Sequence, residues 1–285
     1  MRVTSIIAAA AALMPAAATS QTPFASYDIA SEAVLNDPHD LAIGPDGLLY
    51  VADKLGDRIV VMDPETLEIL STFGDGRLPQ ARDIDFGPDG RAYVSVTGLS
   101  AVAVFDFSSG EPEMVELLRG FPRTEGLLAH SNGRVYVMAS GAGHLVAVED
   151  GEVVAAAGGM PGAHGVEEAL DGSVWVADNF QRRLVRFSPE LEILQVIEGP
   201  AFGLVGARYF AVDEFGRLVV ADQDAHRILL IDPVSEELLG VLGDGLPGEG
   251  PNKFDDPEGA AVMGNEYFFA DSDNNRIVRY VVLLN

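Results

Sequence analysis

Six polar residues that recur along the chain have the side-chain types needed to bind a metal ion or an anion. In chain order they are His39, Arg82, Glu125, His164, Arg208 and Glu258. The order His, Arg, Glu therefore occurs twice. Imidazole and carboxylate groups are ligands of Zn²⁺ and similar divalent ions. Guanidinium groups bind carboxylates and phosphates through paired hydrogen bonds. If the fold brings the six residues together, they have the chemistry of a metal site with an anion clamp.

Each of the six residues stands near the start of a repeat of about 40–45 residues. A tight-turn dipeptide follows in every repeat: Asp46-Gly47, Asp89-Gly90, Asn132-Gly133, Asp171-Gly172, Phe215-Gly216 and Gly264-Asn265. Such a dipeptide between two apolar runs indicates a β-hairpin. Two more short strands follow, as in residues 58–61 and 68–73 of the first repeat. Four short strands per repeat predict an all-β, six-bladed β-propeller with four antiparallel strands in each blade.

In a propeller the first strand of each blade lines the central channel and begins at one of its mouths. Blades 1 and 4 are opposite, so we expect His39 and His164 to face each other across the channel. The two arginines and the two glutamates are expected to do the same. One interpretation is a ligand or metal site at the channel mouth, because polar groups that converge in a concavity are typical of binding sites. The other is a structural ring of Arg–Glu and Glu–His contacts that closes the channel.

When the six repeats are aligned, two further positions predict ion pairs inside the blades. An Asp at the end of the second strand and an Arg at the start of the third occur together in four repeats, as Asp53/Arg58, Asp178/Arg183, Asp222/Arg227 and Asp271/Arg276. Repeats 2 and 3 lack both, with Val96 and Ala101 in one and Ala139 and His144 in the other. Losing one partner would leave a charge unpaired, so joint presence or absence indicates a structural pair.

The N-terminal residues have the layout of a secretory signal peptide. Met1-Arg2 is followed by an apolar run over residues 6–14, by Pro15 and by small residues up to Ser20. We therefore expect a signal peptide over residues 1–20, a propeller over residues 21–285, and a periplasmic or secreted bacterial protein. The sixth repeat ends after its third strand. Residues 24–29 have strand composition, and we expect them to complete the last blade and remove its open edge.

The composition excludes several classes of function. The chain has 285 residues, 18 Lys+Arg against 44 Asp+Glu, a formal net charge of −26 and no cysteine. Disulfides, thiolate metal sites and cysteine nucleophiles are thereby excluded. Nucleic acid is a poor partner for so acidic a surface. No later segment has the length of a membrane span, and we expect a monomer. The acidic background makes Arg82 and Arg208 the groups expected to face a small anionic molecule or a peptide.

The first repeat resembles an NHL repeat. The matching residues are PHDLAIGPDGLLYVAD at positions 38–53, followed by Asp57-Arg58-Ile59-Val60. The segments FGDG at 73–76 and LGDG at 242–245 are similar to the segments that link such repeats. The resemblance covers nearly all of the chain after the leader and is weakest in repeats 2 and 3. It implies an NHL-type propeller, a fold used by enzymes, by binding platforms and by RNA readers with basic surfaces.

Two NHL-like enzyme families add expectations about a site. The lyase domain of peptidylglycine amidating enzymes binds zinc through His residues and uses Arg and Tyr in catalysis. Pro38-His39-Asp40-Leu41 and Ala163-His164-Gly165-Val166 resemble its His segments, and Arg208-Tyr209 would place an Arg and a Tyr at one mouth. That resemblance implies three His ligands and disulfides, whereas this ring has two His and the chain has no cysteine. Glu125 or Glu258 would have to complete the ligand set.

Gluconolactonase-type propellers, which hold one divalent ion with Glu, Asn and Asp, are a second partial resemblance. In this chain, His39-Asp40 and His164-Gly165 stand where that family has an Asn-Gly motif.

Two functions follow from these observations. The first is a metal-assisted lyase or lactonase-type hydrolase of a small anionic substrate. Its assigned residues are His39, His164, Glu125 and Glu258 for a divalent ion (Zn or Ca), Arg82 and Arg208 for substrate binding and catalysis, Tyr209 as acid/base, and Asp40 and Asp83 for further substrate contacts. The alternative is a non-catalytic, exported propeller that binds a peptide, a sugar or a protein partner.

Overall fold

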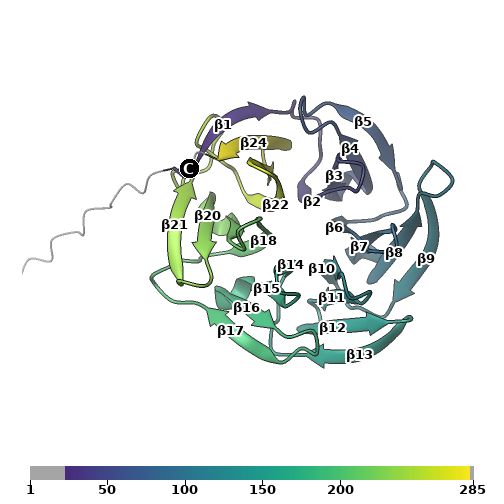
Figure 1. Cartoon of the computed structure of the whole chain (residues 1–285). Coiled ribbons are helices and arrows are strands. Elements are labelled where there is room, and N and C mark those ends of the chain that lie inside the picture. The colour runs from purple at the N-terminus through teal and green to yellow at the C-terminus, as the bar shows by residue number, and fades with distance from the viewer. Residues whose placement is uncertain (1–22, 283–285) are drawn as a thin grey trace, which may run out of the picture.

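Six four-stranded antiparallel sheets surround a central axis in the computed structural model, which describes residues 23–282 (Figure 1). The expected six-bladed, all-β propeller is confirmed. The signal peptide expected over residues 1–20 lies outside the described residues. Within residues 23–282 no helix is long and apolar enough to cross a membrane.

The strands follow the repeats in order. Blade 1 has β2 (Pro38–Ile43), β3 (Leu49–Asp53), β4 (Arg58–Met62) and β5 (Ile69–Phe73). Blade 2 has β6 (Ala81–Phe86), β7 (Ala92–Val96), β8 (Ala101–Asp106) and β9 (Glu113–Arg119). Blade 3 has β10 (Thr124–Ala129), β11 (Val135–Ala139), β12 (His144–Glu149) and β13 (Glu152–Ala157). Blade 4 has β14 (Val166–Glu168), β15 (Val174–Asp178), β16 (Arg183–Phe187) and β17 (Ile193–Ile197).

Blade 5 has β18 (Ala207–Val212), β19 (Leu218–Asp222), β20 (Arg227–Asp232) and β21 (Glu237–Leu242). Blade 6 has β22 (Pro257–Met263), β23 (Glu266–Asp271), β24 (Arg276–Val282) and, from the other end of the chain, β1 (Ala25–Ala30). Single 3₁₀ turns join the second and third strands of four blades: η1 (Lys54–Gly56), η2 (Thr97–Leu99), η3 (Asn179–Gln181) and η4 (Gln223–Ala225).

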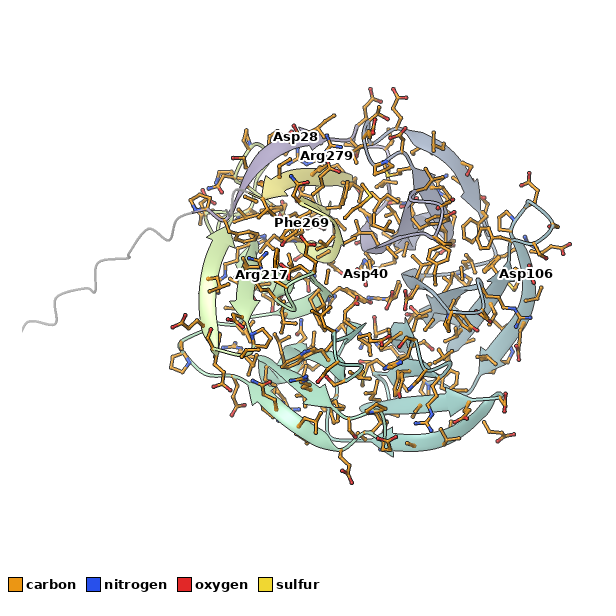
Figure 2. All side chains as sticks on the ribbon, in the orientation of Figure 1. Asp28, Asp40, Asp106, Arg217, Phe269 and Arg279 are labelled. Carbon is orange, nitrogen blue, oxygen red and sulfur yellow. The ribbon has the colours of Figure 1, made fainter. Side chains whose placement is uncertain are left out.

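The ring of blades is closed by β1, which pairs antiparallel with β24, as expected from the sequence. Figure 1 shows the two strands side by side, with the start and the end of the described chain in one sheet. Arg279 Nε donates to Asp28 Oδ2 at 2.9 Å across this seam (Figure 2). Phe24, just before β1, packs into the apolar core shared with blade 5. Strand pairing and core packing therefore close the ring in a chain that has no cysteine.

The four predicted Asp–Arg pairs are all formed. Asp and Arg are direct cross-strand partners, and the Arg Nε to Asp Oδ2 distances are 2.8 Å for Asp53/Arg58, Asp178/Arg183 and Asp271/Arg276 and 2.9 Å for Asp222/Arg227. All four aspartates have 0% exposed surface. In blades 2 and 3 the same cross-strand positions pair Val96 with Ala101 and Ala139 with His144.

A β-bulge near the start of the inner strand turns consecutive side chains toward the channel. The register shifts between Pro38 and Leu41 in β2, and equivalent shifts occur in β6, β10, β18 and β22. Because side chains of a regular strand alternate between faces, the bulge is what allows His39 and the residue after it to occupy the axis together. Where the second residue is Gly126 or Gly259, a Cβ would lie 2.1 or 2.2 Å from a carbonyl oxygen of the next blade. Glycine there permits close approach of the inner strands.

Removing the cation of one Asp–Arg pair should destabilise the fold. Arg183→Ala leaves Asp178 buried without its ion-pair partner, and we expect the free energy of unfolding to fall by about 2 kcal/mol. The double variant Asp178→Val/Arg183→Ala reproduces the residues of blade 2, and we expect it to recover at least half of that loss. Urea denaturation of the three proteins measures both. Equal losses in the single and double variants would show that Asp178 does not need Arg183.

Candidate functional site

The six residues predicted for the axis form a closed ring, called here the polar ring. It lies at the end of the channel where the inner strands begin, the upper mouth. The contacts in order are His39 Nε2–Arg82 Nη1 2.8 Å, Arg82 Nη1–Glu125 Oε2 3.1 Å, Glu125 Oε2–His164 Nε2 3.7 Å, His164 Nε2–Arg208 Nη1 2.8 Å, Arg208 Nη2–Glu258 Oε1 3.4 Å and Glu258 Oε2–His39 Nε2 2.7 Å. Every member contacts both neighbours. This is the geometry expected if the six residues form a structural ring that closes the channel.

The buried charges of the polar ring balance one another. The side chains of both histidines and of Glu125 are 0% exposed and that of Glu258 is 3% exposed, whereas Arg82 and Arg208 reach 9% and 15%. Two guanidinium groups thus offset two carboxylates inside the protein, as buried charges require. Arg208 is the member most accessible from the upper mouth.

The electrostatics of the polar ring follow from these contacts. Burial lowers the pKa of His164 well below its usual range, and the charges of Arg208 and Arg82 lower it further. His164 is therefore neutral and accepts a hydrogen bond from Arg208 at Nε2. Burial raises the pKa of Glu258, but the charge and hydrogen bond of His39 and the charge of Arg208 outweigh it, and the pKa falls to about 2.

The four predicted metal ligands do not meet at one point. Within residues 23–282, the group of three or more metal-binding side chains whose ligand atoms lie within 4.8 Å of one another is Asp37, His39 and Glu258. It contains neither His164 nor Glu125. Asp37, which the sequence analysis missed, has its Oδ1 3.4 Å from His39 Nδ1. A carboxylate beside the second nitrogen of a histidine is the usual means of orienting a metal-binding imidazole.

A signal for Asp37 was present in the sequence. The residues two positions before each member of the polar ring are, in chain order, Asp37, Gln80, Arg123, Gly162, Gly206 and Asp256. Asp37 and Asp256 are the acids among them and lie in adjacent blades 1 and 6. Reading these positions, as well as the ring itself, would have placed a carboxylate beside His39.

Tyr209 does not lie at the mouth as expected, because it is fully buried beneath the polar ring. Its ring centroid is 6.2 Å from that of His39 and 6.0 Å from that of His164. Its hydroxyl has no hydrogen-bond partner in the part of the chain that the structure describes. Burial raises its pKa well above the usual range, and the charges of Glu125 and Asp83 add to this. At neutral pH Tyr209 is protonated, so it has the chemistry of an acid and not of a base.

Asp40 and Asp83 also lie away from the upper mouth. They follow His39 and Arg82 after the bulge and line a cavity in the lower half of the channel. Burial raises the pKa of Asp40 well above its usual range, and the charge of Asp83 raises it further. In this position Asp40 and Asp83 would not contact a substrate that binds to Arg208 at the upper mouth.

A pocket of about 410 Å³ opens at the upper mouth between blades 4 and 5. Its lining includes Arg208 and, from the turns that join second to third strands, Asn179, Phe180, Arg182 and Gln223. The Phe180 side chain is 64% exposed. Arg182 has no ion pair among residues 23–282. Two arginines therefore line one hollow, together with an aromatic ring, two amides and one acid, Asp224.

The repeat pattern predicted a role for Arg208 but none for the turn residues of this pocket. Arg182 occupies the left-handed position that ends its turn, with φ of 55°. The same column contains Asp57, Ser100, Gly143, His226 and Asn275. Asp, Asn and Gly are common in this conformation, and a long side chain is unusual there. The lone arginine in that column was an available signal.

Gln223 connects the pocket to the polar ring. Its Nε2 donates to Glu258 Oε1 at 2.8 Å and to Asp256 Oδ2 at 2.6 Å. Arg208 contacts the same Glu258 oxygen. A ligand that contacts Arg208 or Gln223 in the pocket is therefore one side chain away from the Asp37–His39–Glu258 group.

The fold and the polar ring define a six-bladed β-propeller with a polar axial site. The chain belongs to the DUF5074 family, described as a domain of unknown function, whose match covers residues 34–198. Membership in the NHL family stays a prediction. A segment of 69 residues is 36% identical to the PE-PGRS family protein PE_PGRS18 of Mycobacterium tuberculosis. That match spans 24% of this chain and 13% of the mycobacterial protein.

Solved structures share the fold at low sequence identity. Virginiamycin B lyase from Staphylococcus aureus superposes with a TM-score of 0.65 and 12% identity, over 90% of this chain and 99% of the lyase. An auxiliary nutrient binding protein from Bacteroides thetaiotaomicron has a TM-score of 0.71 and 15% identity, over 86% of this chain and 69% of that protein. Identities this low establish the common fold alone.

The neutral state of His164 should make stability depend on pH. Between the unfolded-chain pKa of 6.5 and the lower folded pKa, only the unfolded chain takes up this proton. This contribution is therefore present above pH 6.5 and is lost as the pH falls, by up to about 1.4 kcal/mol per pH unit. In His164→Gln an amide oxygen can still accept from Arg208 but does not titrate. Urea denaturation at pH 6.5 and 5.5 should show wild type losing roughly 1 kcal/mol more than His164→Gln. Parallel pH profiles would contradict a neutral His164.

Proposed function

We propose that this chain is an exported propeller that binds a small anionic ligand in the pocket at its upper mouth. The observation that carries the proposal is the pairing of Arg182 and Arg208 around one hollow in a chain of net charge −26. An acidic surface repels anions in general, so two converging guanidinium groups make one position selective for them. Export rests on the layout of residues 1–20.

The remaining pocket residues indicate what kind of anion fits. Phe180 offers an exposed aromatic face, Asn179 offers an amide, and Val205 adds apolar surface. The amide nitrogen of Gln223 is already used by Glu258 and Asp256, and Asp224 places one carboxylate in the same lining. This combination suits an organic anion with an apolar or ring-shaped part, such as an aromatic carboxylate. The fold is shared with a protein described as nutrient binding and with virginiamycin B lyase, so propellers of this shape include both a binding protein and a lyase.

Binding of benzoate and of inorganic phosphate tests the pocket. We expect Arg182→Ala to weaken binding about tenfold or more, because a hydrogen bond to a charged group contributes about 1.5–3 kcal/mol. Arg119→Ala is the matched control, since it removes the same charge from the outer strand β9. Isothermal titration calorimetry or NMR titration measures the affinities. Binding to wild type that survives Arg182→Ala unchanged would place the anion elsewhere.

Metal-assisted lyase or hydrolase activity is the second candidate, and the Asp37–His39–Glu258 group favours it. A divalent ion bound there would supply a Lewis acid for the ligand above it. Arg208 would bind and orient the anionic group of the substrate from the side of Glu258. Asp37 would hold the His39 ring in place. Tyr209 would retain its proton beneath the ring, with His39 and His164 on either side.

Zn²⁺ titration separates this ligand group from the one expected from the sequence. Asp37→Asn removes the carboxylate charge beside His39 Nδ1 and leaves all six side chains of the polar ring in place, and we expect it to weaken Zn²⁺ binding at least tenfold. His164→Gln should leave Zn²⁺ affinity within about twofold of wild type, because His164 lies outside the group. Competition with a chromogenic chelator gives the affinities. Equal losses in both variants would favour the ligand set with two histidines, and a wild type that does not bind Zn²⁺ would remove the catalytic candidate.

A further inference from the structure

Two neighbouring turns supply the pocket at the upper mouth with side chains of different chemistry. The turn of blade 4 contributes an exposed aromatic ring, Phe180, and the guanidinium group of Arg182. The turn of blade 5 contributes Gln223 and Asp224, the first two residues of η4. A cation and oxygen acceptors therefore line the same hollow.

Asp224 is the acid of this lining, and its carboxylate has no partner within residues 23–282. No Lys, Arg or His nitrogen of these residues lies within 4.0 Å of it, although Arg182 and Arg208 line the same pocket. Glycine at position 206 makes room for the Asp224 side chain, because a Cβ there would lie 2.6 Å from Asp224 Cγ. The carboxylate therefore lies against the backbone just before β18 and is free to accept hydrogen bonds.

The charges around the pocket leave one cation and one anion unmatched. Arg208 contacts Glu258 at 3.4 Å in the polar ring, so its charge is offset there. Arg182 and Asp224 form no ion pair with each other or with any other group in the part of the chain that the structure describes. A ligand that satisfies both has to carry one negative and one positive charge.

Gln223 adds a second acceptor next to Asp224. Its Nε2 donates to both Glu258 and Asp256, which fixes the orientation of the amide group. The carbonyl oxygen, on the other edge of the amide, accepts no hydrogen bond from residues 23–282 and is not fully buried. It is therefore the part of this 7% exposed side chain that is open to the hollow. An ammonium group has three donors and no acceptor, so neighbouring oxygens without donors are suited to it.

We propose that the ligand of this pocket is a zwitterion, an α-amino acid with an apolar side chain. This inference rests on the anion-binding function proposed above and names its ligand class. The carboxylate would bind Arg182 and Arg208, and the ammonium group would bind Asp224 and the Gln223 carbonyl. The apolar side chain would lie against Phe180. Asp224 repels a simple carboxylate and attracts the ammonium group, so it would select amino acids over other small anions.

L-Phenylalanine and 3-phenylpropionate test this assignment, because they differ only in the ammonium group. We expect wild type to bind L-phenylalanine about tenfold more tightly or better, the effect of a hydrogen bond between charged groups. Asp224→Asn should remove most of this preference and leave the affinity for 3-phenylpropionate unchanged or higher. Asp273→Asn is the matched control, since Asp273 has the equivalent turn position in blade 6 and does not line the pocket. Isothermal titration calorimetry at pH 7.5 measures the affinities.

A preference for L-phenylalanine that depends on Asp224 and not on Asp273 supports the assignment. Wild type that binds 3-phenylpropionate as tightly as L-phenylalanine, or more tightly, would overturn it and leave the anion pocket in place. A preference that survives Asp224→Asn, or that Asp273→Asn removes equally, would also overturn it, because the ammonium group would then be bound elsewhere or attracted by the acidic surface in general. The anion pocket itself fails separately, if neither 3-phenylpropionate nor benzoate binds or if their binding survives Arg182→Ala unchanged.

Discussion

Six inner strands converge on one axis, and the charged groups that they place there have to be neutralised within the channel. A bulge near the start of five of these strands brings consecutive residues onto the axis, so in blades 1, 2 and 5 a second polar side chain, Asp40, Asp83 or Tyr209, follows the ring member. The upper half neutralises its charges with an alternating ring in which Arg82 and Arg208 offset Glu125 and Glu258. Four carboxyl groups line the cavity in the lower half, and no Lys, Arg or His is among the described residues that line it. The two halves of one channel therefore differ in whether nearby arginines neutralise their carboxyl groups.

The rest of the fold keeps this axis in place. Each blade contacts mainly its neighbours, so the ring depends on the seam where β1 joins β24. The Asp–Arg pairs hold the second and third strands of four blades in register next to the turns that form the rim. Those turns present the residues of the upper pocket, Phe180 and Arg182 from one and Gln223 from the next. A surface pocket and a buried ring are consequently coupled through Gln223 and Arg208, which both contact Glu258.

Repetition made much of the structure predictable. The hairpins and the strand that completes the last blade were predictable from short runs of neighbouring residues. The cross-strand contacts Asp53/Arg58 and Val96/Ala101 were predictable because the two partners recur at the same spacing in each repeat. The order of the polar ring was predictable for the same reason, since blade order equals chain order. The depth of Tyr209 and the position of Asp40 and Asp83 below the ring were not. They depend on the bulge, whose geometry no short sequence pattern specified.

The sequence by itself determined the number of blades, the closing strand, the residues of the polar ring and the internal ion pairs, because each of these is set by periodic spacing and by charge complementarity. The tertiary structure alone decided which of these residues meet. It joined Asp37, and not His164, to His39 and Glu258, placed Arg182 beside Arg208, and collected four acids around one cavity. Such groupings arise from the twist of the blades and from side-chain directions at the axis, which act across segments far apart in the chain.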